Sequence, residues 1–578
     1  MQIIGIDIGT TTISGAVLEY ENEKTVKLLE AKTIENGGFM PTANEWEKIQ
    51  DAGAIVKKAE KLLDDLLDKY PQTERIGLTG QMHGIVYIDQ TGTCVSPLYT
   101  WQDGRGSLCE KGQCSLVQEI KEKCDLEAAS GYGLVTHICN LKHGLIPERA
   151  VGFCTIMDYF GMCLTGRKKP VVHVSNAAGF GFFDGRNMKF ETEKLSKMGV
   201  KENWLPEVCT GIEKLGLYRN RQVTTAIGDN QASFLGAAGK EENTLLVNMG
   251  TGGQISILSD QYFAEKGIEA RPFLNGKYLL VGSSLCGGKS YALLEQFFRR
   301  VVKAATGEDS FLYPVMEQFA KTGKEQSNRI SEDRKLKIRT TFDGTRTDPK
   351  SSGSIQGLTS DNFTPEAFTY GILEGMGDEL YQMYRTIKNG IGIQIKNLIG
   401  SGNGVRKNPV FCEMLEELFT FTKLKNDSFH LEMSSCCINK ILKDTIFSYY
   451  DEWTGRGIEP EIQITDKLLF MNGNEQGIQR IFQNIIKNGL DHGEKKISIS
   501  LEEVENNIRI QIKNQVCHVE KINVDQVFER FYKADEARSK TSSGLGLSIA
   551  KELVLRMDGK ISARIEGNEF CVEIVFPK

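Results

Sequence analysis

The sequence contains no apolar run of the roughly 18 residues that a membrane-spanning helix needs, so we expect no membrane span. Proline is scarce, at 13 of 578 residues, and no proline-rich or glycine/serine-rich stretch marks a flexible linker between domains. A strong excess of one charge sign is also lacking, since the net charge of −6 gives no indication of nucleic-acid binding. With 40% hydrophobic and 25% charged residues, the chain has the composition of a globular protein of about three or four domains.

The cysteines lack any pattern that is typical of a zinc site or a disulfide framework. There are 14 of them, none in a C-x-x-C pair, and only Cys436 and Cys437 are adjacent. Neighbouring cysteines rarely bridge, so this pattern is typical of reduced thiols, most of them in the core. The first residues enter an apolar stretch directly, and we expect no signal peptide. These observations predict a cytoplasmic protein.

The N-terminal stretch predicts a buried strand that runs into a tight polar turn. Apolar residues at 3–8 are followed by Gly9, Thr10 and Thr11, and Asp7 interrupts the apolar run close to the turn. A carboxylate beside such a turn can hold a metal ion, and the free N–H groups and hydroxyls of the turn can face a phosphate. The alternative is an ordinary β-hairpin with a Gly-Thr turn.

The same design recurs about 240 residues later. There an apolar strand at 245–249 is followed by Gly250, Thr251, Gly252 and a further glycine. Two such turns favour two similar lobes that face one nucleotide.

Between the two turns, several polar residues follow predicted strands. Met82 and His83 lie just past a predicted strand at 76–79, where α/β proteins usually bind ligands; the alternative is a turn histidine with a local hydrogen bond. The stretch 99–105 combines aromatic rings and an amide with Asp103 and Arg105. This set suits a polyhydroxylated ligand, and a solvated loop is the alternative.

Asp229 follows a short apolar stretch and stands where a helix is predicted to begin. It is either a helix N-cap, worth about 1 kcal/mol, or a general base held near a bound hydroxyl. Later in the chain, a predicted strand runs into the glycine-rich turn 400–404. Glycine there allows the backbone to approach a flat base or a phosphate closely.

The last part of the chain carries a different set of motifs. Asn484 and Asn488 lie four residues apart on one face of a predicted helix at 477–492. Asparagine lowers helix stability, so metal coordination by an amide oxygen is one reason for the pair, and satisfaction of a polar helix face is the alternative. Two alternating strands at 496–501 and 508–513 follow, and the glycine-rich stretch 541–548 opens a helix whose N–H groups can meet phosphate oxygens.

The motifs of the first 418 residues, taken in order, resemble the carbohydrate kinases of the FGGY family. The stretches 80–84 and 99–105 most resemble the sedoheptulokinase-like members. The resemblance implies a two-lobed, actin-like (ribonuclease-H-like) α/β ATPase fold, with lobes at 1–215 and 216–418. It implies that Asp7 holds Mg²⁺ and that Asp229 removes the proton of the sugar hydroxyl. The ATP phosphates are expected to contact Gly9, Thr10, Thr11, Gly250, Thr251 and Gly252, and adenosine to contact Gly400, Gly402, Asn403 and Gly404. The sugar is expected at Met82, His83, Asp103 and Arg105.

This family normally continues with a strand and an alanine-rich helix that close the adenine pocket. Here a different pattern begins at residue 420. We therefore expect the second lobe to be truncated, with one helix around 413–419 shared by both parts of the chain.

Residues 420–578 resemble the ATP-binding domain of sensor histidine kinases, which has the α+β GHKL (Bergerat-type) sandwich fold. We expect a remnant helix and connector at 419–460 and the ATPase domain at 461–578. Asn514 stands where the family usually has the aspartate of Asp-x-Gly-x-Gly. The helix with the phospho-accepting histidine is missing, and His430 lacks the neighbours of such a residue. The resemblance implies that the nucleotide contacts Asn484, Asn488, Asn514, Thr541, Gly544, Leu545 and Gly546, with Asn488 as a Mg²⁺ ligand.

These resemblances predict an ATP-dependent phosphotransferase with ATP and Mg²⁺ as cofactors. Its substrate is expected to be a sugar, such as the ketose sedoheptulose, and a response regulator is a possible partner. One alternative is a non-catalytic regulator that senses sugar and binds nucleotide. Another is a chimeric chain with neither activity intact.

Overall fold

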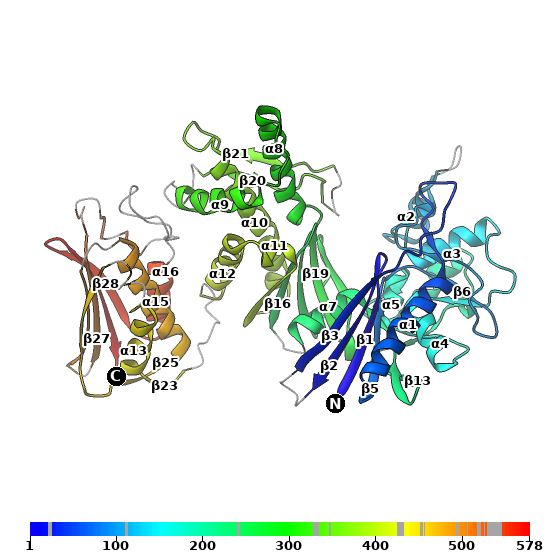
Figure 1. Cartoon of the computed structure of the whole chain (residues 1–578), viewed down its shortest axis with the longest axis horizontal. Coiled ribbons are helices and arrows are strands. Elements are labelled where there is room, and N and C mark those ends of the chain that lie inside the picture. Colours follow the sequence, from blue (N-terminus) through cyan, green and yellow to red (C-terminus); the bar gives the residue numbers. More distant parts are fainter. Residues whose placement is uncertain are drawn as a thin grey trace. The chain divides into compact units, whose positions relative to one another are not determined.

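The computed structural model describes most of the chain (Figure 1). The residues described are 1–20, 26–109, 114–239, 243–327, 335–345, 348, 350–424, 433–450, 453, 455, 457–492, 496–505, 507–516, 519, 522–524, 526–528 and 546–578. The chain divides into two compact units, Met1–Leu246 with Ser256–Val281, and Val247–Ile255 with Gly282–Lys578.

The first unit is built on a seven-stranded sheet. Its strand order is β13-β14-β5-β1-β2-β3, and β15 also pairs with β5. The strands of this sheet are β1 (Gln2–Ile8), β2 (Thr12–Tyr20), β3 (Val26–Glu35), β5 (Thr73–Gly80), β13 (Lys214–Tyr218), β14 (Arg221–Thr224) and β15 (Ile227–Gly228). Along β1, Ile4, Ile6 and Ile8 are buried on one face, because successive side chains of a strand point to opposite faces.

Helices α1 (Ala52–Lys69) and α4 (Ile156–Thr165) pack on this sheet and on each other. Helix α1 begins at Ala52, because the side chain of Asp51 accepts a hydrogen bond from Ala54 N and caps the helix. The other helices of the unit are α2 (Leu116–Cys124), α3 (Gly133–Lys142), α5 (Val174–Gly179), α6 (Thr192–Lys197), α7 (Asp229–Ala238), η1 (Arg105–Ser107), η2 (Glu202–Trp204) and η3 (Leu274–Gly276).

Short strand pairs complete the first unit. Pairs form between β4 and β7, β6 and β8, β9 and β12, and β10 and β11. Their bounds are β4 (Ile49–Gln50), β6 (Val86–Ile88), β7 (Leu98–Tyr99), β8 (Gly152–Cys154), β9 (Val171–His173), β10 (Phe183–Asp184), β11 (Lys189–Phe190) and β12 (Glu207–Cys209).

A second sheet, with strand order β18-β19-β17-β16-β22, belongs to the C-terminal lobe. Its strands are β16 (Thr244–Met249), β17 (Gly253–Ser259), β18 (Ile268–Pro272), β19 (Tyr278–Ser284) and β22 (Asn397–Ser401), and β20 (Lys337–Arg339) pairs separately with β21 (Ser354–Gln356). The helices are α8 (Gly287–Thr306), α9 (Tyr313–Ser327), α10 (Pro365–Ile391), α11 (Asn403–Arg406) and α12 (Pro409–Leu424). Helix α12 crosses the predicted junction at 418/419, and α10 contacts α8, α9 and α12.

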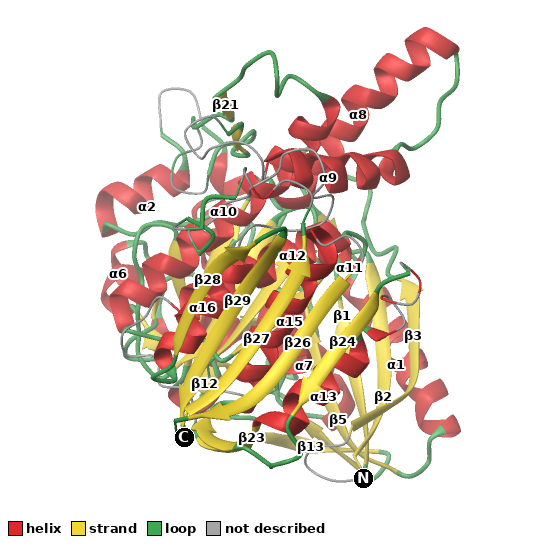
Figure 2. Cartoon of the chain, turned by 90° about the vertical axis from the view of Figure 1, so that its left-hand side faces the viewer, coloured by secondary structure: helices red, strands yellow, loops and turns green. Residues whose placement is uncertain are grey.

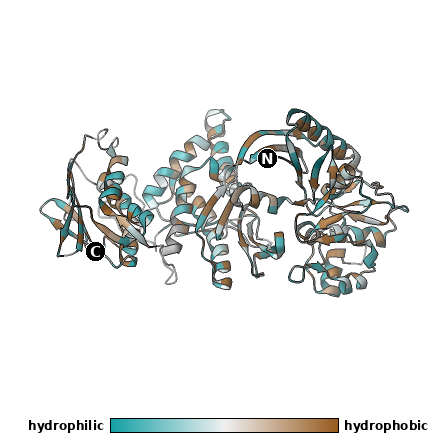
Figure 3. Ribbon diagram, turned by 90° about the horizontal axis from the view of Figure 1, so that it is seen from below, coloured by the Kyte–Doolittle hydropathy of each residue, from teal (hydrophilic) through white to brown (hydrophobic). Residues whose placement is uncertain are grey.

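The last part of the chain is a sheet with helices on one face. The sheet has the order β24-β26-β27-β29-β28, and α15 packs against α13, α16 and β27 (Figure 2). The elements are β23 (Ser434–Cys437), α13 (Ile438–Ser448), β24 (Glu459–Ile464), β25 (Phe470–Gly473), α15 (Glu475–His492), β26 (Lys496–Val504), β27 (Asn507–Gln515), α16 (Gly546–Arg556), β28 (Lys560–Glu566) and β29 (Glu569–Pro577). Buried residues alternate with exposed or half-buried ones along β26 and with half-buried ones along β27, and hydrophobic and hydrophilic residues are mixed along the strands (Figure 3).

The observed architecture confirms the predicted fold class, a two-lobed α/β body followed by an α+β sandwich. The domain boundaries at 215/216, 418/419 and 460/461 stay predictions. Among the helices formed by the described residues, none has the length and apolar character that crossing a bilayer requires.

Candidate functional site

Three neighbouring parallel strands of the first unit end at the same edge of its sheet. In the strand register, Ile8 of β1 lies opposite Gly80 of β5, and Gly80 lies opposite Gly228 of β15. Glycine is required at position 80, since a Cβ there would lie 2.4 Å from the carbonyl oxygen of Ile8. The predicted residues that follow these strand ends are therefore brought together, as expected for the carboxyl edge of parallel strands.

Two carboxylates meet at this edge. Asp7 projects from β1 on the face opposite the core, and Asp229 begins helix α7 immediately after β15. Both residues are exposed. The pKa of the Asp7 carboxyl is raised, first by partial loss of solvation and second by the negative charge of Asp229. Two carboxylates that repel each other in this way form a good site for a cation.

The Gly-Thr turn after β1 is held by a ring of side-chain amides. Gln50 Nε2 donates to the carbonyl oxygen of Thr10 at 2.8 Å, and Gln81 Nε2 donates to Gln50 Oε1 at 3.0 Å. Trp101 Nε1 donates to the Thr10 hydroxyl at 3.0 Å, and Asn36 Nδ2 donates to the carbonyl oxygen of Gly9 at 2.7 Å. Sequence analysis missed Asn36 and Gln50 as site residues, because they lie far from the turn in the sequence and belong to none of the motifs identified above.

His83 occupies a constrained position beside the carboxylates. Its φ of 74° is unusual for a residue other than glycine, and its ring stacks on Tyr132 with centroids 5.0 Å apart. Burial lowers the pKa of the imidazole, and Nδ1 donates to the carbonyl oxygen of Gly179 at 2.7 Å, so the neutral ring keeps Nε2 as an acceptor. The charges of Arg271 and Glu269 on β18 also act on this ring. Sequence analysis missed both residues, since no motif marks them.

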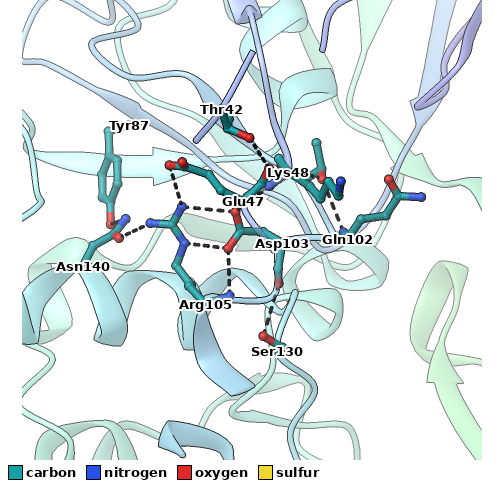
Figure 4. A network of polar contacts seen from close by, with 10 residues as sticks. Thr42, Glu47, Lys48, Tyr87, Gln102, Asp103, Arg105, Ser130 and Asn140 are labelled. Carbon is teal, nitrogen blue, oxygen red and sulfur yellow. Dashed lines mark hydrogen bonds and ion pairs between the residues drawn. The ribbon is translucent and has the colours of Figure 1, made fainter. Parts of the chain in front are cut away.

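Asp103 and Arg105 face each other inside the first unit (Figure 4). Arg105 Nε donates to Asp103 Oδ1 at 2.6 Å, and its NH1 donates to Asn140 Oδ1 at 2.6 Å. The guanidinium lies 4.3 Å from the ring centroid of Tyr99, and Lys48 N donates to the same carboxylate. Both side chains are buried, so this pair shapes the loop at 99–105 from within.

Met82 packs close to the start of α7. It is buried, and a Cβ at Gly228 would lie 2.6 Å from its sulfur. Met82 therefore sets the spacing between the end of β5 and the helix that carries Asp229. Thr11, by contrast, is exposed at the end of its turn.

In the second unit, the turn after β16 is braced by the first turn of α8. Gly288 N donates to the carbonyl oxygen of Gly250 at 3.0 Å, and Lys289 N donates to that of Thr251 at 2.9 Å. Gly250 N bonds to the carbonyl oxygen of Gly252 at 3.0 Å, which closes the turn. The side chain of Lys289 forms an ion pair with Asp343, so its charge is already matched by a carboxylate.

The predicted adenosine turn lies at the end of β22, also in the second unit. Gly402 has φ 84°, and a Cβ there would lie 2.4 Å from the carbonyl oxygen of Met249. Gly404 lies close to the side chain of Met249, and Asn403 begins α11. Gly400, inside β22, is exposed. The turns at 250–253 and 400–404 are thus brought together at the end of β16.

In the C-terminal part, four of the predicted nucleotide contacts lie in or around helix α15. A Cβ at Gly546 would lie 3.6 Å from Asn484 Cβ, and a Cβ at Gly489 would lie 3.7 Å from Asn514 Oδ1. Asn488, next to Gly489, is half-buried. Within the described residues, Nδ2 of Asn484 and Nδ2 of Asn514 are buried donors without a partner.

The other predicted contacts of this module, Thr541, Gly544 and Leu545, lie outside the described residues, as does His430. The residues that are described fit a nucleotide, because orphaned amide donors match the acceptor nitrogens and oxygens of a base or phosphate. The Asp7–Asp229 pair fits Mg²⁺, which binds through one or two carboxylates and completes its shell with water and phosphate. A closed cage of three or more His, Cys, Asp or Glu side chains is not found in the described part of the chain.

The sequence belongs to two classes of kinase. Residues 2–246 and 245–419 match the N-terminal and C-terminal domains of the FGGY family of carbohydrate kinases. Residues 473–578 match the histidine kinase-, DNA gyrase B-, and HSP90-like ATPase family. The chain is therefore an FGGY-family carbohydrate kinase fused to a histidine-kinase-type ATPase domain.

Individual relatives support both halves. Sedoheptulokinase from Mus musculus is 27% identical over 463 residues, an alignment that covers 72% of this chain and 93% of the mouse protein. Sensor histidine kinase YcbM from Bacillus subtilis is 31% identical over 168 residues, which cover 28% of this chain and 54% of YcbM. The chain thus spans about half the length of that kinase, and the aligned stretch is longer than residues 473–578, so the similarity extends upstream of the ATPase domain.

Solved structures confirm the fold of the first part. Xylulose kinase from Rhodospirillum rubrum matches with a TM-score of 0.60 at 18% identity, covering 72% of this chain and 85% of the other. Gluconate kinase from Lactobacillus acidophilus matches with a TM-score of 0.58 at 20% identity, covering 72% and 84%.

Proposed function

We propose that residues 2–419 transfer a phosphoryl group from ATP to a hydroxyl group of a ketose, of which sedoheptulose is the leading candidate. The observation that carries this proposal is the meeting of Asp7, His83 and Asp229 at the ends of three adjacent strands. Phosphoryl transfer depends on positioning and charge neutralisation more than on covalent chemistry, and this edge offers both.

Each residue of the strand edge has a separate task in this proposal. Asp229 accepts the proton of the attacking sugar hydroxyl. Its carboxylate is exposed, and hydrogen bonds from Asn230 N and Asn230 Nδ2 to Oδ1 hold it in place. His83 orients the sugar through Nε2, because its ring is fixed by Tyr132 and Gly179. Asp7 holds Mg²⁺, which supplies charge neutralisation at the phosphates. Asp103 and Arg105 act by fixing the loop that carries Trp101.

We further propose that the C-terminal module binds a second ATP with Mg²⁺ at Asn488. Within the part of the chain that the structure describes, the buried Nδ2 atoms of Asn484 and Asn514 have no hydrogen-bond partner, which favours this second site. If the module transfers phosphate, a response regulator is the partner that we expect. A non-catalytic role as a sugar-sensing regulator is the competing function, and it predicts sugar binding without turnover.

Calorimetric titration of an ATP analogue tests the two sites separately. The wild-type chain is expected to bind two equivalents, with one site lost in Asp7→Ala and the other in Asn488→Ala. Asp65→Ala and Asn472→Ala are matched controls, since both residues are exposed and lie away from the proposed ligands. If neither Asp7→Ala nor Asn488→Ala removes a site, both assignments are wrong.

A further inference from the structure

Helix α5 carries buried polar side chains that the proposed chemistry does not use. Ser175 and Asn176 are 1% and 0% exposed, and His173, which directly precedes the helix, is fully buried. A buried polar group costs free energy unless it is hydrogen-bonded, so the partners of these side chains show what the helix holds. One of the elements that α5 contacts is β15, the strand that leads into Asp229.

Two side chains of α5 hold the backbone that leads into Asp229. Asn176 Nδ2 donates to the carbonyl oxygen of Ala226 at 3.1 Å, and Gly228 N donates to Ser175 Oγ at 2.9 Å. Both hydrogen bonds are buried. Because Asp229 directly follows Gly228 and begins α7, these bonds fix the point from which its carboxylate projects.

His173 fixes the orientation of the Ser175 hydroxyl. His173 Nδ1 accepts a hydrogen bond from Ser175 N at 3.2 Å and lies 2.8 Å from Ser175 Oγ. Burial lowers the pKa of His173 to about 4, so the ring is neutral near pH 7 and Nδ1 is an acceptor. The hydroxyl therefore donates to His173 and accepts from Gly228 N. A serine bonded to a histidine can be a nucleophile, but here both groups are buried and the serine oxygen is already occupied.

The other end of α5 holds the ring of His83. The carbonyl oxygen of Gly179 accepts the hydrogen bond from His83 Nδ1 at 2.7 Å. A Cβ at Gly179 would lie 3.4 Å from that nitrogen and 3.3 Å from Met82 Cε, so the helix end packs closely on this loop. Ser175 and Gly179 are four residues apart, which is about 6 Å along a helix axis. One helical turn therefore separates the two points of attachment.

Asn176 also carries a cost that core stability alone does not explain. Its Oδ1 is a buried atom without a hydrogen-bond partner among the described residues. An unpaired buried acceptor lowers stability, and an apolar side chain of similar size would avoid this cost. The hydrogen bond that Nδ2 gives to Ala226 is the gain that accompanies it.

We propose that α5 is the positioning element of the strand edge. Ser175 and Asn176 set the place of Asp229, and Gly179 sets the ring of His83. The helix thus fixes the spacing between the general base and the imidazole that orients the sugar. These roles rest on the function proposed above for Asp229 and His83. Ser175 and Asn176 are positioning residues, since they act through the backbone before Asp229.

Kinetics of Ser175→Ala and Asn176→Leu test the effect on the base. Ketose-dependent ADP release should show a kcat lowered by about 10–100-fold, because a misplacement of about 1 Å can cost about 100-fold. The KM for the ketose should change by less than about twofold, since His83 keeps its bond to Gly179. The matched control is Thr155→Ala, which removes a buried hydroxyl that caps α4 through Asp158 N. It should lower stability and leave kcat unchanged.

Urea unfolding of the same variants separates positioning from general stability. Asn176→Leu should leave the unfolding midpoint nearly unchanged, because the loss of one hydrogen bond is offset by removal of the unpaired Oδ1. A fall in kcat that follows the loss of stability equally in all three variants would overturn the proposal. An unchanged kcat in both Ser175→Ala and Asn176→Leu would overturn it as well.

Two measurements on the full chain need no activity. Hydrogen exchange at 226–232 should become about tenfold faster in Ser175→Ala and Asn176→Leu and stay unchanged in Thr155→Ala. Nitrogen NMR of the seven histidines, with the His83 signal assigned from His83→Gln, should show the His83 proton on Nδ1. Unchanged exchange, or a proton on Nε2, would overturn the proposal. If both results hold but the wild type releases no ketose-dependent ADP, the proposed function is wrong and the anchoring by α5 stands.

Discussion

The first unit and the C-terminal lobe carry nearly the same strand-and-turn design in different states of completion. The first unit closes its sheet with β14 and buries Ile76 and Leu78 completely or almost completely. Among the described strands of the C-terminal lobe, β22 is an outer strand of its sheet, and Ile399 is half-buried. The comparison shows that the Gly-Thr-Gly turn does not depend on strand pairing alone, because hydrogen bonds from the first turn of helix α8 hold it directly.

The largest expected effect is the loss of turnover in Asp229→Asn. If the complete unit supplies the general base, the rate of sugar phosphorylation should fall by about 10²–10⁴-fold, while sugar binding changes little. The measurement is the rate of ADP release that depends on added ketose. Asp260→Asn, an exposed residue of the first unit, is the control. Sugar binding without sugar-dependent ADP release in the wild type would identify a sensor, whereas equal release in the wild type and Asp229→Asn would show that Asp229 is not the general base.

Much of this comparison could be predicted from sequence. The strand periodicity and the two glycine-rich turns located β1, β16 and β22, and the order of the motifs identified both kinase families. Local patterns suffice for these features, because strand alternation and turn chemistry are encoded in neighbouring residues.

The side-chain networks could not be predicted in the same way. That Asp103 and Arg105 lie at or near the sugar stays a prediction. The sequence could not show that the two side chains pair inside the protein, or that Trp101 of the same loop bonds to Thr10. Gln50 joined the site only through long-range contacts. A short sequence pattern does not show which side of a loop faces the interior, since this depends on distant segments of the chain.

The second prediction concerns Asp158, a fully enclosed carboxyl of the first unit. Burial raises its pKa to about 7 from 3.8, and its Oδ1 is among the buried atoms without a partner in the described residues. The folded state therefore keeps a proton that the unfolded chain releases above 3.8, so stability falls as pH rises from about 4 to about 7 and then levels off. The loss is on the order of 4 kcal/mol.

Asp158→Asn should remove this pH dependence, as measured by urea unfolding at several pH values. The matched control lies in the C-terminal lobe, where Glu379 is half-buried and accepts hydrogen bonds from Ser284 and Thr340. The pKa of Glu379 is likewise raised by burial, and its two donors oppose that shift. A pH profile that Asp158→Asn leaves intact would show that the first unit tolerates the buried charge.

The third prediction compares equivalent strands by truncating one side chain in each. Ile76→Ala in β5 should cost about 2–5 kcal/mol, because it leaves a cavity in a closed core. Ile399→Ala in β22 should cost about 1 kcal/mol, since solvent already reaches that side chain. Hydrogen exchange of each lobe measures the two costs separately. Equal costs would show that β22 is covered as well as β5, which would contradict the difference in burial.

The smallest expected effects come from a matched pair of helix caps. Asp51 caps α1 in the first unit through Ala54 N, and Thr364 caps α10 in the C-terminal lobe through Ala367 N. Replacing either residue with alanine removes one hydrogen bond at a helix start and should cost about 1 kcal/mol. If the lobes unfold independently, Asp51→Ala should speed exchange only in the first unit and Thr364→Ala only in the C-terminal lobe. Exchange that rises throughout the chain in either variant would mean that the two lobes unfold together as one cooperative unit.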